Sequence, residues 1–119
     1  MKRLLITDLD DTLYDWIGFF IPSFCEMADE IASITKINKD TLLKEFKLIH
    51  QRYGSVEYPF AALELPSVLD KYSGKSKEEI KEILGEAFHK FNSVRKHSLK
   101  LYDGVEETLK QLFDDGIII

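Results

Sequence analysis

The chain has 119 residues, of which 45% are hydrophobic and 31% are charged, a composition typical of an ordinary globular domain. Its formal net charge is −5 and it contains no long basic block, so the sequence gives no electrostatic support for partners such as nucleic acid or an anionic membrane. The single cysteine cannot form a disulfide within the chain, and we expect a cytoplasmic location.

The first predicted element is a short apolar strand over residues 3–8, of the kind that is buried on both faces of a parallel sheet. From about Asp15 the apolar residues recur every three or four positions, which predicts an amphipathic helix with an inward stripe of Phe20, Phe24, Met27, Ile31 and Ile34. Asn38 is a predicted N-cap, and a second helical stripe ends at Gly54 after Leu42, Phe46, Ile49 and Tyr53.

The segment that follows is less regular, and Pro66 is expected to kink or end a short helical stretch that begins after Pro59. Ser76 and Glu79 have the spacing of a capping box, which predicts a third helix with an apolar stripe from Ile80 to Phe91. Residues 95–102, "RKHSLKLY", look extended.

The last predicted elements are a compact helix over residues 104–115, stopped by Gly116, and an apolar strand that begins at Ile117. A right-handed crossover between two parallel strands needs one helix, and residues 104–115 can supply it. The helices between about residues 15 and 96 are then surplus, which suggests a helical insertion into an α/β fold.

Asp8 and Asp10 lie within "LLITDLDDTLYDW", residues 4–16, at the carboxyl end of the first predicted strand, where ligands bind in open α/β sheets. One carboxylate can attack phosphorus to form an acyl-phosphate, and the other can protonate the leaving oxygen and later activate water. Because two carboxylates and a phosphate repel one another, the site needs a cation, and Mg²⁺ suits all-oxygen ligands. Thr12 offers a hydroxyl and an amide to a phosphate oxygen or to the turn. The alternative is an ordinary surface turn, where Asp is common.

The apolar run followed by D-x-D-x-T-L resembles the first motif of the haloacid dehalogenase-like (HAD) superfamily, and "LYDGVEETLKQL", residues 101–112, resembles the segment by which its capped members return to their core. The resemblance implies an α/β, Rossmann-like HAD core, present here only as its N-terminal strands in residues 1–14 and 98–119. It implies a mainly α-helical cap domain at residues 15–97. It also implies that Asp8 is the nucleophile, that Asp10 is the general acid/base, and that both contact Mg²⁺, with Thr12 as the motif threonine.

The function implied by the resemblance is a Mg²⁺-dependent phosphohydrolase that acts on a small phosphorylated metabolite through an aspartyl-phosphate. The alternative is a non-catalytic HAD-like module for binding or regulation. Asp11 stands where many relatives have Gly, and the family's second, third and fourth motifs have no match in this sequence. We therefore expect an N-terminal fragment without activity of its own, which binds Mg²⁺ weakly at best and either self-associates through its strands or keeps its ends disordered beside an ordered cap.

The remaining residues of interest lie in the predicted helices and in the segments that connect them. Trp16 either lines a substrate pocket or packs among the cap helices, whereas Phe20 is predicted to be a core residue and Cys25 a buried structural thiol. Residues 95–100 are interpreted as a solvated hinge, the alternative being a role in binding an anionic substrate. Residues 51–59 hold polar and aromatic groups in a loop, and loops of this kind often carry specificity.

Overall fold

The computed structural model describes residues 3–119, and most of them are helical. Its elements in chain order are β1 (Arg3–Leu4), α1 (Trp16–Thr35), α2 (Lys39–Tyr53), the 3-10 helix η1 (Ala61–Leu63), α3 (Pro66–Lys71), α4 (Lys77–Ile83), α5 (Gly85–Ser98), α6 (Val105–Asp114) and β2 (Ile117–Ile118). Within residues 3–119, no helix combines the length and the apolar character that crossing a membrane requires.

The predicted α/β class is wrong, because the described residues are 64% helix and 6% strand and include no Rossmann-like core of several strands. β1 and β2 pair in parallel, with Arg3 opposite Ile117, as expected for these two segments. The strand expected over residues 3–8 extends only from Arg3 to Leu4, and Ile6 is 84% exposed. The physical reason is that two short strands cannot cover each other's faces, so the apolar run has nothing to be buried against.

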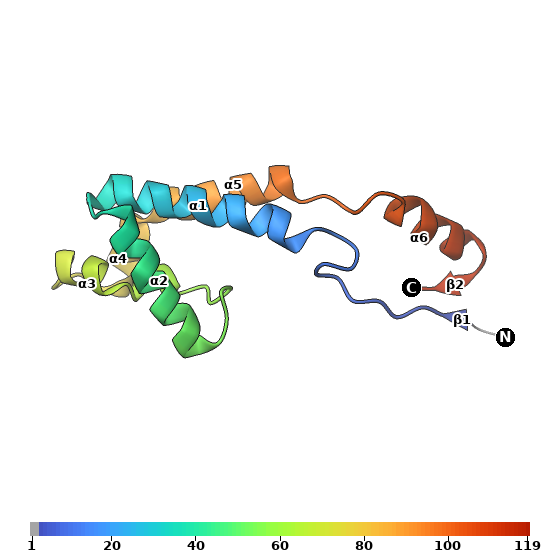
Figure 1. Cartoon of the computed structure of the whole chain (residues 1–119), viewed down its shortest axis with the longest axis horizontal. Helices are drawn as coiled ribbons and strands as arrows, with labels where there is room; N and C mark the ends of the chain where they lie inside the picture. Colours follow the sequence, from blue (N-terminus) through green and yellow to red (C-terminus); the bar gives the residue numbers. More distant parts are fainter. Residues whose placement is uncertain (1–2) are drawn as a thin grey trace.

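The molecule is elongated, with extents of 63 × 24 × 23 Å and a radius of gyration of 19.0 Å. A compact domain of about 100 residues has a radius of gyration of about 13 Å. Figure 1 shows the reason: helices α1 to α5 lie at one end of the molecule, and α6 and the strand pair lie at the other. We call residues 16–98 the helical body and residues 3–15 with 99–119 the strand end. The predicted domain boundaries at residues 14/15 and 97/98 stay a prediction.

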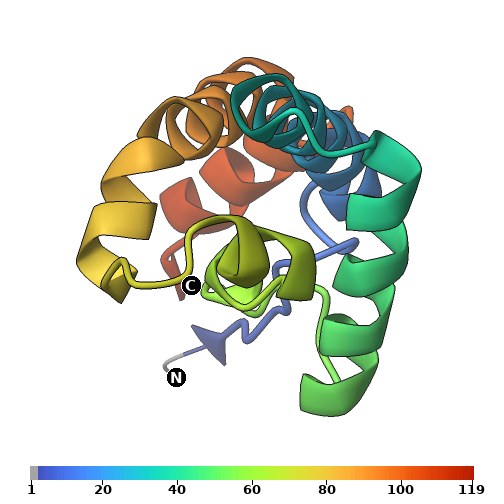
Figure 2. The same ribbon diagram turned by 90° about the vertical axis from the view of Figure 1, so that its left-hand side faces the viewer.

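The core of the described residues lies in the helical body. Helix α1 packs along α5 and also contacts α2. In the end view of Figure 2 the segment with η1 and α3 lies between α2 and α4. The second predicted stripe is confirmed for Leu42, Phe46 and Ile49, which are all at most 2% exposed, but not for Tyr53, which is 46% exposed at the end of α2. Phe20 is also buried, as predicted. These positions share one face of each helix, and burying that face is what stabilises helices of this length.

Three predicted helix ends are confirmed by their hydrogen bonds. The Asn38 side chain accepts a 2.8 Å hydrogen bond from the Asp40 amide at the start of α2, and Gly54 ends α2 with a φ of 67°. Ser76 and Glu79 form the expected capping box at α4, with bonds of 2.7 and 3.2 Å between side chain and backbone in both directions.

Two other expectations about helix limits are wrong, and a third holds in part. The stripe from Ile80 to Phe91 belongs to two helices, because the backbone of Leu84 leaves the helical region between α4 and α5. Residues 95–98 are the last turn of α5 rather than extended chain, since α5 packs along α1 and tertiary packing decides where a helix ends. Between Pro59 and Pro66 the short helix η1 ends at Leu63, as expected, and Pro66 then starts the unpredicted helix α3, because its fixed φ suits the first helical position.

Candidate functional site

The acidic loop, residues 8–15, is the part of the strand end that leads into α1. It runs beside residues 99–104, the segment on which the chain returns from α5 to α6 (Figure 1). The carbonyl of Leu9 accepts hydrogen bonds from the amides of Thr12 and Leu13, at 3.2 and 3.0 Å, and this makes a tight turn. The Tyr102 amide then donates to the carbonyl of Leu13 at 2.9 Å. The loop is therefore held both by its own turn and by the segment on which the chain returns.

Two acids of the loop cap helix α1. The Asp15 side chain is the N-cap and accepts a 2.8 Å hydrogen bond from the Gly18 amide. The Asp11 carboxylate accepts a 2.9 Å bond from the Trp16 amide, the first residue of the helix. Free amides and the helix dipole make a helix N-terminus favourable for negative charge. Asp11 and Asp15 are thus explained by local structure and need no catalytic role.

The backbone of Asp11 is left-handed, with a φ of 54°. Most side chains avoid this region, whereas Gly, Asn and Asp tolerate it. This conformation explains why Asp can occupy a position at which the resembled motif often carries Gly.

Asp8 and Asp10, the predicted catalytic pair, have no part in capping. Both side chains are exposed, and within residues 3–119 the Asp8 carboxylate has no hydrogen-bond or ion-pair partner. Asp10 Oδ1 accepts a short hydrogen bond from the Tyr14 hydroxyl, and this bond raises the pKa of Tyr14 above its ordinary value. Tyr14 therefore remains a protonated donor and fixes the orientation of the Asp10 carboxyl group, leaving its Oδ2 atom accessible.

The two other predicted site residues differ in their surroundings. Thr12 is exposed, and its hydroxyl points back to the Asp10 carbonyl at 3.5 Å, so it supports the turn. Trp16 is half-buried at the start of α1, with its ring stacked on Phe20 at a centroid distance of 4.6 Å. Its indole Nε1 donates a 2.9 Å hydrogen bond to Glu57 Oε1. The loop thus connects through Trp16 to the interior of the helical body.

The donor atoms near the turn are oxygens, which are the ligands that Mg²⁺ prefers. Asp8 and Asp10 are exposed residues that offer carboxylate oxygens, and Asp10 also has a backbone carbonyl, which the Thr12 hydroxyl contacts at 3.5 Å. Mg²⁺ in phosphate-handling sites is held by one or two carboxylates and completes its coordination with water and substrate oxygens. Among the described residues, no group of three or more His, Cys, Asp or Glu side chains converges on one point. A bound ion would accordingly take the remaining ligands from water and phosphate.

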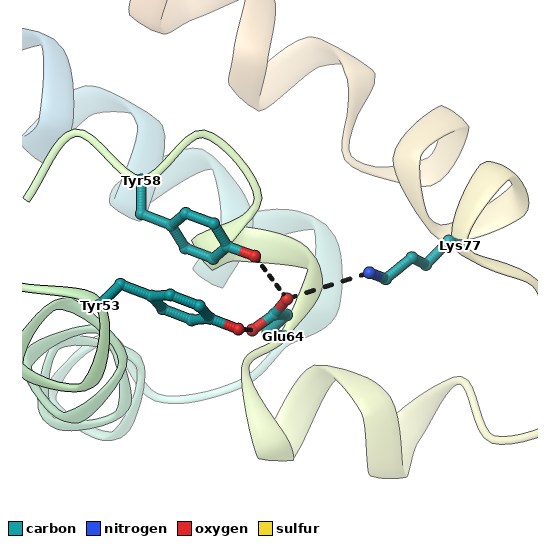
Figure 3. Close-up of polar contacts among 4 residues, drawn as sticks. All are labelled: Tyr53, Tyr58, Glu64 and Lys77. Atoms are coloured by element: carbon teal, nitrogen blue, oxygen red, sulfur yellow. Dashed lines mark hydrogen bonds and ion pairs between the residues drawn. The ribbon is translucent and has the colours of Figure 1, made fainter. Parts of the chain in front are cut away.

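A second polar cluster lies away from the acidic loop, inside the helical body (Figure 3). The hydroxyls of Tyr53 and Tyr58 donate to the two carboxylate oxygens of Glu64 at 2.9 and 2.8 Å, and Lys77 Nζ lies 3.9 Å from Glu64 Oε1. Hydrogen bonds from Tyr58 and then from Tyr53 lower the pKa of Glu64. The neighbouring Tyr53 and Glu64 raise the pKa of Tyr58. The cluster links the end of α2, the segment around η1 and the start of α4 through side-chain contacts.

Sequence reasoning missed two residues that contact the predicted site. Tyr14 has a local signal, since it lies four residues after Asp10 across a turn that the sequence already suggested. Glu57 lies in the segment 51–59 that the sequence singled out, but nothing in the sequence pairs it with Trp16, because the two are 41 residues apart and only the packing of the helical body brings them together.

Comparison of the chain with protein-family models, with curated proteins and with solved structures finds no match.

Proposed function

We propose that the acidic loop performs Mg²⁺-dependent phosphoryl transfer to water, as in the HAD-like hydrolases whose first motif it resembles. The substrate would be a small phosphorylated metabolite. One observation carries the proposal: of the acids in this loop, Asp11 and Asp15 cap α1, while Asp8 and Asp10 are exposed and take no part in capping. Exposed carboxylates two residues apart on a fixed turn are suited to work as a nucleophile and a proton carrier.

The proposed chemistry has two steps. In the first, an Asp8 oxygen attacks phosphorus, the bond from phosphorus to the leaving oxygen breaks, and Asp10 gives its proton to that oxygen. In the second, water attacks the phosphorus of the aspartyl-phosphate and Asp10 takes a proton from the water. The bond between phosphorus and the Asp8 oxygen breaks, which releases phosphate and restores the Asp8 carboxylate. The Tyr14 hydrogen bond to Oδ1 supports this role, because it orients the carboxyl group and leaves Oδ2 for the proton.

Asp8 and Asp10 would hold the Mg²⁺ ion through carboxylate and carbonyl oxygens. When bound, the ion supplies positive charge that offsets the repulsion between the carboxylates and the phosphate. Thr12, through its hydroxyl contact with the Asp10 carbonyl, keeps the turn in place beneath the pair.

The test measures phosphate release from a panel of phosphorylated metabolites, with Mg²⁺ and with EDTA, by purified protein that contains this chain together with the family's second, third and fourth motifs. Asp8→Asn is expected to lower kcat by about 1,000-fold or more, because the nucleophile is lost. Asp10→Asn is expected to lower kcat by about 100- to 10,000-fold, which is the usual contribution of a general acid and base.

Asp11→Asn is the matched control. It removes the same charge from the same turn, but Asn tolerates the left-handed backbone and keeps an acceptor for the Trp16 amide, so we expect kcat within about twofold of the wild type. Near-normal turnover by Asp8→Asn, or an equal loss in the Asp8 and Asp11 variants, would contradict the mechanism. Absence of Mg²⁺-dependent phosphate release from every compound would favour the non-catalytic binding module instead.

A further inference from the structure

The helical body contains a pocket of about 330 Å³ between α1, α2, α5 and the loop that leads to η1. This volume is at the lower end of the range for small-molecule sites, and so it fits a molecule of one or two rings. Most of its wall is apolar and aromatic, and it includes Phe20, Phe24, Phe46 and Phe91.

The aromatic rings of the pocket are arranged in both stacked and edge-on pairs. Phe20 is stacked with Phe24 at 5.9 Å between centroids, and the Phe91 ring meets Phe20 edge-on at 6.1 Å. Phe24 meets Phe46 edge-on at 5.0 Å. Walls that present both ring faces and ring edges favour a flat aromatic ligand, because such a ligand can stack on the faces and receive edge contacts.

The polar residues of the pocket are few, and most have a partner already. Asn92 donates to the Phe88 carbonyl at 3.1 Å, and Glu57 accepts from the Trp16 indole. Burial lowers the pKa of His50, so its ring is neutral at pH 7. Arg95 is different: it is an exposed residue that lines the pocket, and within residues 3–119 its guanidinium group has no ion pair or hydrogen bond. The pocket therefore combines an apolar interior with one uncommitted cation.

We propose that this pocket binds a small planar aromatic molecule that carries an anionic group, with the ring among the phenylalanines and the anion on Arg95. Guanidinium groups bind carboxylate and phosphate through two parallel hydrogen bonds, so either anion fits Arg95 chemically. The Glu57 carboxylate repels an anion at its own side of the pocket, which directs the anionic group toward Arg95. The proposal does not depend on the phosphohydrolase function.

Ligand binding in the pocket can be followed through Trp16, whose side chain contacts two residues of the pocket wall. Trp16 is the single tryptophan of the chain, its ring is stacked on Phe20, and its indole hydrogen is held by Glu57, both of which line the pocket. Its indole N–H therefore gives one signal in a ¹⁵N–¹H NMR spectrum, and that signal is expected to shift when the pocket fills.

The experiment titrates the purified chain with 1-naphthoate, 1-naphthyl phosphate and the neutral 1-naphthamide, without Mg²⁺, by calorimetry and by NMR. We expect the better of the two anions to bind about tenfold more tightly than the amide, and its identity tells which anion the site takes. Arg95→Gln is expected to weaken anion binding about tenfold and to leave amide binding unchanged. The Trp16 signal is expected to shift with all three ligands.

Lys96→Gln is the matched control, since it removes the same charge from the next position of α5, on an exposed residue outside the pocket. We expect it to leave the affinities within about twofold. Equal weakening by the Arg95 and Lys96 variants, an amide that binds as tightly as both anions, or a Trp16 signal that does not move would each overturn the proposal. Circular dichroism of both variants establishes that they are folded, and a phosphohydrolase assay that fails has no bearing on these outcomes.

Discussion

Residues of the same type are covered to very different extents in the helical body and in the strand end. Ile31 in α1 is 0% exposed, whereas Ile6, just after β1, is 84% exposed. Every hydrophobic residue that is buried among residues 3–119 lies between positions 19 and 87, and the strand end exposes Leu4, Leu9, Phe113 and Ile118. Both regions are rich in apolar residues, but only the helical body buries them away from solvent.

The difference follows from how the two kinds of element satisfy their backbone and cover their side chains. A helix makes its own backbone hydrogen bonds and has to bury only one face. In the helical body, α1 covers the apolar faces of both α2 and α5. A parallel strand needs partners at its edges and layers on both faces, and here the partner of β1 is the two-residue strand β2. The helical body is consequently the part of the chain that carries the stability.

The largest expected effect tests this contrast directly. Ile31→Ala deletes a fully buried side chain and is expected to lower the free energy of unfolding by about 2–5 kcal/mol. Ile6→Ala makes the same chemical change at an exposed site and is expected to alter it by less than about 0.5 kcal/mol. Urea unfolding followed by circular dichroism measures both, and similar losses in the two variants would show that the strand end is as well packed as the body.

A smaller effect is expected at the junction between the regions. A methyl group on Gly18 would collide with the Asp15 carboxylate that caps α1, whereas one on Gly85, at the start of α5, would meet nothing within 4 Å. Both changes to Ala favour the helix by propensity, but Gly18→Ala also disturbs the cap. We expect Gly18→Ala to be about 1 kcal/mol less stable than Gly85→Ala in thermal unfolding. Equal stabilities would show that the Asp15 cap contributes little.

The smallest expected effect concerns pH and the Glu64 cluster. The Tyr58 and Tyr53 hydroxyls hold the pKa of Glu64 below its usual 4.5, so ionised Glu64 stabilises the fold above that pH. This contribution is lost as the pH falls through the lowered pKa of the folded state. We expect Glu64→Gln to lower the unfolding temperature at pH 7 and to approach the wild type in acid. A difference between the two proteins that is constant from neutral to acidic pH would contradict this assignment.

Several features could be predicted from the sequence because they depend on neighbours in the chain. The capping box of Ser76 and Glu79, the Asn38 cap and the end of α2 at Gly54 are local hydrogen-bonding and backbone preferences, and all are present in the structure. The stripe of Leu42, Phe46 and Ile49 was predictable for the same reason, since helical periodicity places them on one face.

The tertiary structure alone decided the rest. An apolar run such as residues 3–8 becomes a long buried strand only if other strands and layers cover it, and its sequence does not show whether they do. The end of α5 at Ser98 depends on packing along α1, and the break at Leu84 between α4 and α5 had no signal in the apolar stripe. The acid cluster shows both contributions within one loop. Its spacing gave the candidates Asp8 and Asp10, whereas the capping roles of Asp11 and Asp15 appear only in the folded backbone, where their carboxylates meet the free amides of α1.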